Sequence, residues 1–260
     1  MVSDVGSAVT NLGLLALALG AIFFLIARHR VALARALSTT AVLGCAELTA
    51  AAGQGPSVIV VGRTGPGPTG PLQAPITGQD CVWYRVVWWS GGPGSSDRRR
   101  SVYRSSEPFT VTDSTGAVQV AAGLADRYLF EDDLYRELPV ALVEIDVLDA
   151  APHPDARDRM KRYGFHMSGH RRDVCEIFEY RVPTDRPITV LGRPRRDGSG
   201  VLLTAGWGIC GVAGQSLDKL RTGARYHAKD SREAGRYFAI GGAALVAAGL
   251  LLRVLGWLAG

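Results

Sequence analysis

Two long apolar stretches lie at opposite ends of this 260-residue chain and enclose a polar middle region. The first runs from residue 12 to residue 27 (LGLLALALGAIFFLIA), and the second from residue 238 to residue 258 (FAIGGAALVAAGLLLRVLGWL). A helix of about 20 apolar residues crosses the hydrocarbon core of a bilayer, so the second stretch is long enough, and the first becomes so when residues 5–11 join it. We therefore predict a multi-pass membrane protein with two spans, whose polar middle region lies on one side of the lipid bilayer.

Basic residues flank the inner ends of both apolar stretches. Arg28, Arg30 and Arg35 follow the first stretch. The second stretch is preceded by Arg221, Arg225, Lys229, Arg232 and Arg236. Because basic loops stay on the cytoplasmic side, this pattern predicts a cytoplasmic middle region and outward-facing termini. The high content of Ala, Arg and Gly is typical of a GC-rich bacterium, so we expect a bacterial plasma membrane.

The composition changes along the chain divide it into five parts. These are an N-terminal transmembrane helix (1–28), a juxtamembrane helix and linker (29–57), a β domain (58–215), a second juxtamembrane helix (216–236) and a C-terminal transmembrane helix (237–260). Both juxtamembrane helices are expected to continue the spans into the cytoplasm.

Short β-branched and aromatic runs separated by Gly and Pro predict strands in the middle region. The strongest is CVWYRVVWW at residues 81–89, and others lie at 58–61, 108–112, 174–182 and 188–192. The sequence DSTG at residues 113–116 is typical of a hairpin turn. We therefore predict a mainly β fold, a small antiparallel barrel or sandwich flanked by two transmembrane helices, with an OB-like barrel as one form of it.

Two patterns resemble nucleotide and nucleic-acid sites. The segment GPGPTG at residues 65–70 matches G-x-G-x-x-G, but its prolines remove backbone N–H groups that would bind phosphate. The aromatic run at 81–89, with basic residues at 98–100, could stack on single-stranded nucleic acid, but packing in a core explains the tryptophans better. We therefore expect neither a cofactor nor a nucleic-acid partner.

The candidates for a metal site are His166, His170 and Cys175, because histidines four residues apart would share one face of a helix. The glycines and serine at 164–169 argue against a helix, and no fourth ligand is evident. The acidic residues at 131–133 could bind Mg²⁺ or Ca²⁺, but a solvated loop explains them better. We therefore predict no metal.

The remaining chemistry-bearing residues do not form a catalytic pattern. The four cysteines, Cys45, Cys81, Cys175 and Cys210, stand at no C-x-x-C spacing. Thiols stay reduced in the cytoplasm, so we expect four small buried side chains. Neither a nucleophile elbow nor a phosphate-binding P-loop nor an H-E-x-x-H motif occurs, and no catalytic residue is predicted.

Three strings in the middle region resemble the GIDE domain, also called the beside-a-membrane domain. They are PLQAPITGQDCVWYRVV (Pro71–Val87), SSEPFTVTDSTGAVQV (Ser105–Val120) and EYRVPTDRPITVLGRP (Glu179–Pro194). The family includes mitochondrial membrane-anchored RING-type E3 ubiquitin ligases and many bacterial and plant proteins, with the same order of span, domain and span. The matching positions, which we expect to be structural, are Pro71, Leu72, Pro75, Gly78, Cys81, Tyr84, Pro108, Phe109, Asp113, Gly116 and Gly192.

The chain departs from the ligases after its second span, where they carry a RING finger. A RING needs eight Cys or His ligands in paired spacings, and this sequence has four cysteines and five histidines dispersed along its length. The resemblance therefore implies a RING-less member, in which ubiquitin transfer has no residues to carry it.

Three functions are consistent with these observations. The first is a non-catalytic, membrane-tethered binding, sensing or scaffolding module with an unidentified protein or small-ligand partner. The second, implied by the resemblance, is a RING-type E3 ligase-like protein. The third is a hydrolase or metal-dependent enzyme built around residues 166–175 or 131–133. Small residues in the second span (Gly241, Gly242, Ala244, Ala248 and Gly249) could pack against the first span or form a homo-oligomer.

Overall fold

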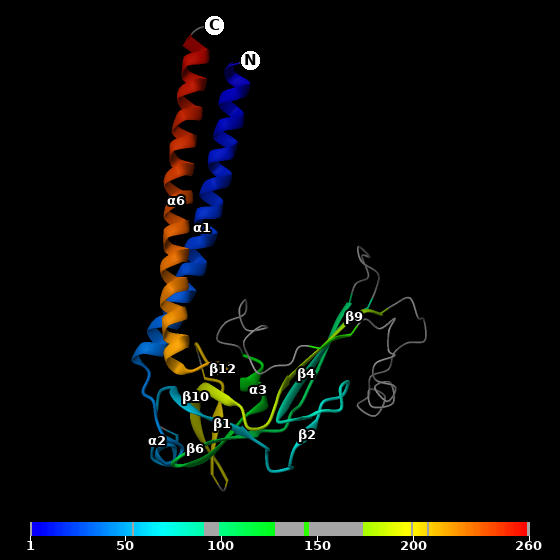
Figure 1. Cartoon of the computed structure of the whole chain (residues 1–260). Coiled ribbons are helices and arrows are strands. Elements are labelled where there is room, and N and C mark those ends of the chain that lie inside the picture. Colours follow the sequence, from blue (N-terminus) through cyan, green and yellow to red (C-terminus); the bar gives the residue numbers. More distant parts are fainter. Residues whose placement is uncertain are drawn as a thin grey trace. The chain divides into compact units, whose positions relative to one another are not determined.

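The structure, a computed structural model, describes residues 2–53, 55–90, 99–127, 143–145, 174–198, 200–206 and 208–258. The chain forms two compact units. One combines the two ends of the chain, Met1–Thr39 and Asp218–Gly260, and the other is the middle region, Thr40–Leu217. Figure 1 shows the first as two long helices and the second as a group of strands.

The end unit consists of α1 (Val2–Thr39) and α6 (Leu217–Leu258), which lie side by side and antiparallel (Figure 1). Both are long and apolar enough to cross a membrane. They contain 38 and 42 residues, which at 1.5 Å per residue is roughly 57 and 63 Å. A hydrocarbon core is about 30 Å thick, so each helix is long enough to extend well beyond it.

Glycines let α1 and α6 approach backbone to backbone. Gly6, Gly13 and Gly20 of α1 face Gly249, Gly242 and Gly235 of α6, and each series repeats every seven residues. A Cβ atom on Gly13 would lie 2.7 Å from the Val246 nitrogen and 2.9 Å from the Gly242 carbonyl oxygen. Small residues at such spacing favour close helix packing. Of the small residues noted in the second span, Gly242 and Gly249 therefore pack against the first.

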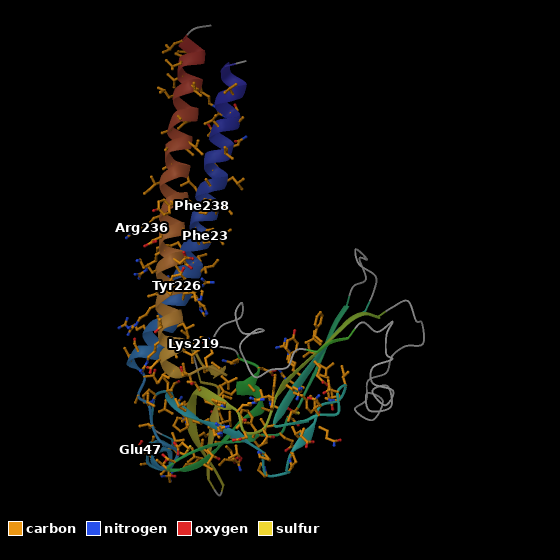
Figure 2. The ribbon with its side chains drawn as sticks, in the orientation of Figure 1. Phe23, Glu47, Lys219, Tyr226, Arg236 and Phe238 are labelled. Atoms are coloured by element: carbon orange, nitrogen blue, oxygen red, sulfur yellow. The ribbon has the colours of Figure 1, made fainter. Side chains whose placement is uncertain are left out.

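Side chains on either side of the glycines complete the contact. The rings of Phe23 and Phe238 stack with centroids 5.3 Å apart (Figure 2). Arg30 donates a hydrogen bond from Nη1 to the Ser231 hydroxyl at 3.2 Å. Arg221 donates from Nε to the Leu37 carbonyl at 2.9 Å, so a basic side chain satisfies a carbonyl of the last turn of α1.

The middle unit is built on a mixed sheet whose strands are β1 (Val58–Gly65), β6 (Phe109–Asp113), β7 (Gly116–Val120), β10 (Pro187–Asp197), β11 (Gly200–Thr204) and β12 (Gly211–Ala213). The strand order is β1-β6-β7-β11-β10, and β1 also pairs with β10, which closes a barrel of five strands. The pairs are antiparallel except β7–β11, which is parallel. β12 adds to β10.

Every second side chain of the barrel strands lies in the core, because successive side chains of a strand point to opposite faces of the sheet. The core side chains include Val58, Val60, Phe109, Val111, Val118, Val120, Val190 and Leu203. Before the barrel, the chain passes through η1 (Cys45–Glu47) and α2 (Leu48–Ala51), whose Leu48 is fully buried in the same core. After β7 comes the short α3 (Ala122–Ala125), which contributes the buried Leu124.

A second sheet and a small hairpin are inserted between barrel strands. The sheet has the order β5 (Arg99–Arg104), β4 (Trp83–Ser90), β9 (Val174–Val182) and β8 (Val143–Ile145). The hairpin pairs β2 (Leu72–Gln73) with β3 (Asp80–Cys81). Within β4, Trp83, Tyr84, Val86 and Val87 are all buried, so both faces of the first half of this strand are covered.

The prediction of fold class is confirmed in part. The barrel and the two long terminal helices are present, but two features differ. β7 and β11 run parallel, so the sheet is mixed rather than antiparallel. The chain as a whole is not mainly β, because α1 and α6 continue far beyond their apolar stretches and together outnumber the strand residues.

We expect Gly242→Ala to lower the thermal unfolding midpoint of the full chain in detergent, whereas Gly241→Ala leaves it unchanged or raises it. The new Cβ at residue 242 would lie 2.9 Å from the Leu17 nitrogen, while at residue 241 it meets only open space. Overpacking costs about 1–3 kcal/mol, and replacing an exposed helical glycine by alanine gains up to about 1 kcal/mol. Circular dichroism at 222 nm checks both variants. Equal midpoints would contradict the backbone contact.

Candidate binding site

The weakest pairing in the barrel lies between β7 and β11. They pair through two positions, Gln119 with Leu202 and Val120 with Leu203, while β6–β7 and β10–β11 each pair through five. Beyond Gln119 the two strands are no longer joined. We call this opening, between the β6–β7 hairpin and the β10–β11 turn, the barrel seam.

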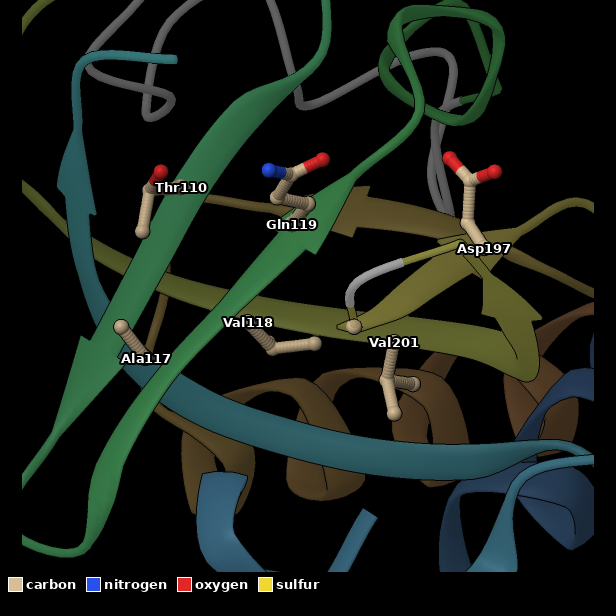
Figure 3. Close-up of a pocket in the computed structure, with 7 residues that line it drawn as sticks. Thr110, Ala117, Val118, Gln119, Asp197 and Val201 are labelled. Atoms are coloured by element: carbon tan, nitrogen blue, oxygen red, sulfur yellow. The ribbon is translucent and has the colours of Figure 1, made fainter. Parts of the chain in front are cut away.

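A pocket of about 300 Å³ lies in the barrel seam (Figure 3). It is lined by Thr110, Ala117, Val118, Gln119, Asp197, Gly200 and Val201. The residues therefore come from β6, β7, the end of β10 and the start of β11. Ligand pockets for small molecules start near this size.

The pocket combines three polar side chains with an apolar base. Figure 3 shows the polar ends of Thr110, Gln119 and Asp197 pointing the same way, while Val118 and Val201 lie on the other side of the opening. Among the described residues, none of these three polar side chains has a hydrogen-bond partner. A hydroxyl, an amide and a carboxylate are thus left available to a ligand, which can both donate to them and accept from them.

Strand register places a guanidinium beside the pocket. Thr110 lies opposite Gln119, Gln119 opposite Leu202, and Leu202 opposite Arg195. These four residues form one row across the outer surface of the barrel, because paired residues share a face of a sheet. Arg195 is exposed and makes no ion pair with a described residue.

The family-like residues around Asp113 hold the β6–β7 hairpin in place. Oδ1 of Asp113 accepts hydrogen bonds from the Thr115 backbone N–H at 2.7 Å and hydroxyl at 2.6 Å, and from the Gly116 N–H at 3.0 Å. Oδ2 accepts from the Cys45 N–H at 2.8 Å. Burial opposes ionisation of Asp113, but the hydrogen bonds from Thr115 and Cys45 outweigh it and lower its pKa to about 2.

A buried glutamate that sequence reasoning did not single out holds the loop between β2 and β3. Glu179 is 0 % exposed. It accepts hydrogen bonds from the Ile76 N–H at 2.6 Å and from the Thr77 N–H and hydroxyl at 3.1 and 2.7 Å. Gly78 ends this loop with φ +69°, a conformation that favours glycine. The only sequence signal was an acid within an alternating apolar strand.

Several of the other positions that we expected to be structural are buried or lie at close contacts in the middle unit. Pro75, Cys81, Tyr84 and Phe109 are buried, while Pro71 and Leu72 begin the β2–β3 hairpin. The Pro108 carbonyl lies so close to Gly67 that a Cβ there would collide with it, and a Cβ at Gly192 would lie 2.8 Å from Leu124. Burial, with the nearby Glu179 carboxylate, raises the pKa of Cys81 to about 12.

The predicted metal candidates fall on residues whose side chains the structure does not describe. His166, His170 and the acidic residues 131–133 lie outside the described residues, as does the side chain of Cys175, whose backbone belongs to β9. Within the described part of the chain, no three His, Cys, Asp or Glu side chains converge as a metal site requires. The G-x-G-x-x-G segment is a turn, in which the Gly70 N–H donates to the Gly67 carbonyl at 3.0 Å.

Glu179→Gln is expected to lower the free energy of unfolding by about 2 kcal/mol, because a buried amide cannot accept all three hydrogen bonds and turns its NH₂ group toward N–H donors. Chemical denaturation of the full chain measures the loss. Glu107→Gln is the matched control, since Glu107 makes no side-chain hydrogen bond or ion pair with a described residue. Equal stability of the two variants would show that Glu179 does not anchor the loop.

Asp113→Asn is expected to cost about 1 kcal/mol at neutral pH, after allowance for solvent screening. Because the folded-state pKa is lowered, this stabilisation is present above the unfolded value of about 3.9 and is lost as the pH falls toward 2. Unfolding curves from pH 7 to pH 2 should therefore converge for the variant and the parent. Asp80→Asn, at an exposed position, should run parallel to the parent at every pH.

Known proteins offer no relative from which the role of the pocket could be inferred. No family model, no curated protein and no solved structure matches this chain.

Proposed function

We propose that this chain is a membrane-anchored, non-catalytic binding module whose barrel seam binds a small polar ligand. The observation that carries the proposal is the pocket itself, where Thr110, Gln119 and Asp197 present polar groups that make no hydrogen bond to a described residue, above an apolar base. Concave sites with a few convergent polar groups are the usual form of a ligand site.

The strand order supports the same position for the site. Counted along the chain, the five barrel strands neighbour one another in the order 1-2-3-5-4, and the third and fifth run parallel. This is the arrangement of an OB-like barrel, a fold that binds ligands over strands 2 and 3 and the loop between strands 4 and 5. Here these are β6, β7 and the β10–β11 turn, which line the pocket. The strand order supports the position of the site only through the likeness of this barrel to the OB-like fold.

The side chains that line the pocket favour a small neutral or cationic ligand. Asp197 is the charged residue of the lining, and the exposed Arg195 lies beside the pocket, where its charge partly offsets that of Asp197. Thr110 and Gln119 can donate and accept hydrogen bonds, and Val118 and Val201 offer apolar contact. A small polyol, an amino sugar or an amine fits this set of groups.

The resemblance to the GIDE domain agrees with this proposal. Two of the three resembling strings contain β6, β7 and most of β10, whereas Asp197, Gly200 and Val201 of the pocket lie outside all three strings. As part of the proposal, the barrel faces the cytoplasm at a bacterial plasma membrane, because arginines follow the apolar part of α1 and precede that of α6. The alternative of an E3 ligase-like protein stays a prediction, which a ubiquitin-transfer assay would decide.

The test uses the full chain in detergent, screened by thermal shift against a panel of polyols, amino sugars and amines. A ligand that binds the seam raises the unfolding midpoint. Gln119→Ala and Asp197→Asn should each weaken its binding about tenfold, since one such hydrogen bond contributes about 1.5 kcal/mol.

Matched controls are Gln79→Ala and Asp80→Asn, which change the same residue types at exposed positions outside the pocket. Both controls should bind as the parent does. Equal binding by the pocket variants, or chemical turnover of the ligand, would contradict the proposal.

A further inference from the structure

The register set by the glycine contacts offsets the apolar stretches of α1 and α6 from each other along the helix axis. Gly20 lies against Gly235, and Gly13 against Gly242. Since the helices are antiparallel, residues 18–27 of α1 lie beside residues 228–237 of α6. The first segment is wholly apolar, and the second contains Lys229, Arg232 and Arg236 together with Asp230 and Glu233. Apolar and basic side chains therefore share one depth along the helix pair.

One side of the helix pair carries both kinds of residue. The stacked rings of Phe23 and Phe238 mark the opposite side. At 100° per residue, Arg28 on α1 and Arg232 and Arg236 on α6 lie about 120–160° around their helices from these phenylalanines. Phe24 stands one turn before Arg28, so it lies along the same side of α1.

The two apolar side chains and the three arginines on this side of the helix pair are exposed, and the arginines make no ion pair with a described residue. Phe24 and Leu25 are 67 % and 64 % exposed, and all three arginines are exposed. None of the three makes an ion pair with a described residue, while the nearby Glu233 pairs with Lys229 at 3.8 Å. The side therefore presents three free guanidinium groups next to a bare apolar surface.

We propose that Arg28, Arg232 and Arg236 form a seat for the headgroup of an anionic phospholipid, whose acyl chain lies on Phe24 and Leu25. This proposal rests on the membrane anchoring proposed above. Guanidinium groups bind phosphate through paired hydrogen bonds, and basic residues at the end of a span attract anionic lipids. The apolar neighbours select a lipid over a free anion, since only a lipid brings both a charge and a hydrocarbon chain.

The test reconstitutes the full chain into vesicles of phosphatidylcholine alone and of phosphatidylcholine mixed with phosphatidylglycerol. Resistance to alkaline extraction reports insertion in both. Electron spin resonance of spin-labelled lipids then gives the association of each lipid with the protein. Phosphatidylglycerol should be preferred about fivefold or more over phosphatidylcholine, and about 0.5 M salt should reduce the preference.

The triple variant Arg28→Gln, Arg232→Gln and Arg236→Gln should insert normally and lose the preference. Its matched control neutralises Arg186, Arg193 and Arg196, three exposed arginines of the middle unit, and should keep it. Soluble glycerol phosphate should not displace the labelled lipid.

Three results would overturn the seat: equal association of both lipids with the inserted parent chain, equal loss in the control variant, or displacement by glycerol phosphate. Failure of the parent chain to insert into either vesicle would overturn the membrane anchoring as well, so the two proposals fail in distinguishable ways. The salt dependence of the parent keeps the seat testable if the triple variant does not insert.

Discussion

The pairing of β1 with β10 is the constraint on which the middle unit depends. It joins six residue pairs, from Val58 with Gly192 to Arg63 with Pro187, and brings together strands that are far apart in the sequence. Once this side is closed, the last barrel strand, β11, must lie between β10 and β7. It reaches β7 for two residue pairs only. The barrel is thus closed along the whole β1–β10 pair but only in part between β7 and β11. The pocket lies where β7 and β11 are not paired.

Two carboxylates hold the hairpins and loops of the middle unit in place. Asp113 links the β6–β7 hairpin to Cys45, and Glu179 links the loop after β2 to β9. Each carboxylate satisfies backbone N–H groups that would otherwise lack a partner, which is costly in a buried position. These positions hold hairpins and loops in place, and the polar groups that face a ligand are others.

The end unit follows a different principle. If the helices span a membrane, as we propose, their association brings little hydrophobic gain, so close packing of small residues has to supply the stability. The six glycines spaced by seven give that packing and also set the register. Register has a chemical consequence here, since it places the apolar residues 18–27 beside a basic segment of α6.

Much of this organisation could be predicted from local sequence. Continuous apolar runs predicted the two long helices, and β-branched runs with glycine turns predicted a small barrel, because both signals depend on neighbouring residues alone. The aromatic run at residues 81–89 likewise predicted a strand, and β4 covers Trp83–Ser90. The segment at residues 65–70, whose prolines lack the N–H groups of a phosphate-binding loop, forms a turn closed by the Gly67–Gly70 hydrogen bond.

The pocket and the arginine seat could not be predicted in this way. Thr110, Gln119 and Asp197 lie in strands that meet only when the barrel closes, and no local pattern marks them. Likewise, Arg28 and Arg232 share a side only because the glycines choose one register of α1 against α6. The sequence by itself determined which segments are helix, strand and turn. The tertiary structure alone decided which polar groups stand together, because strand pairing and helix register depend on contacts between residues that are distant in the chain.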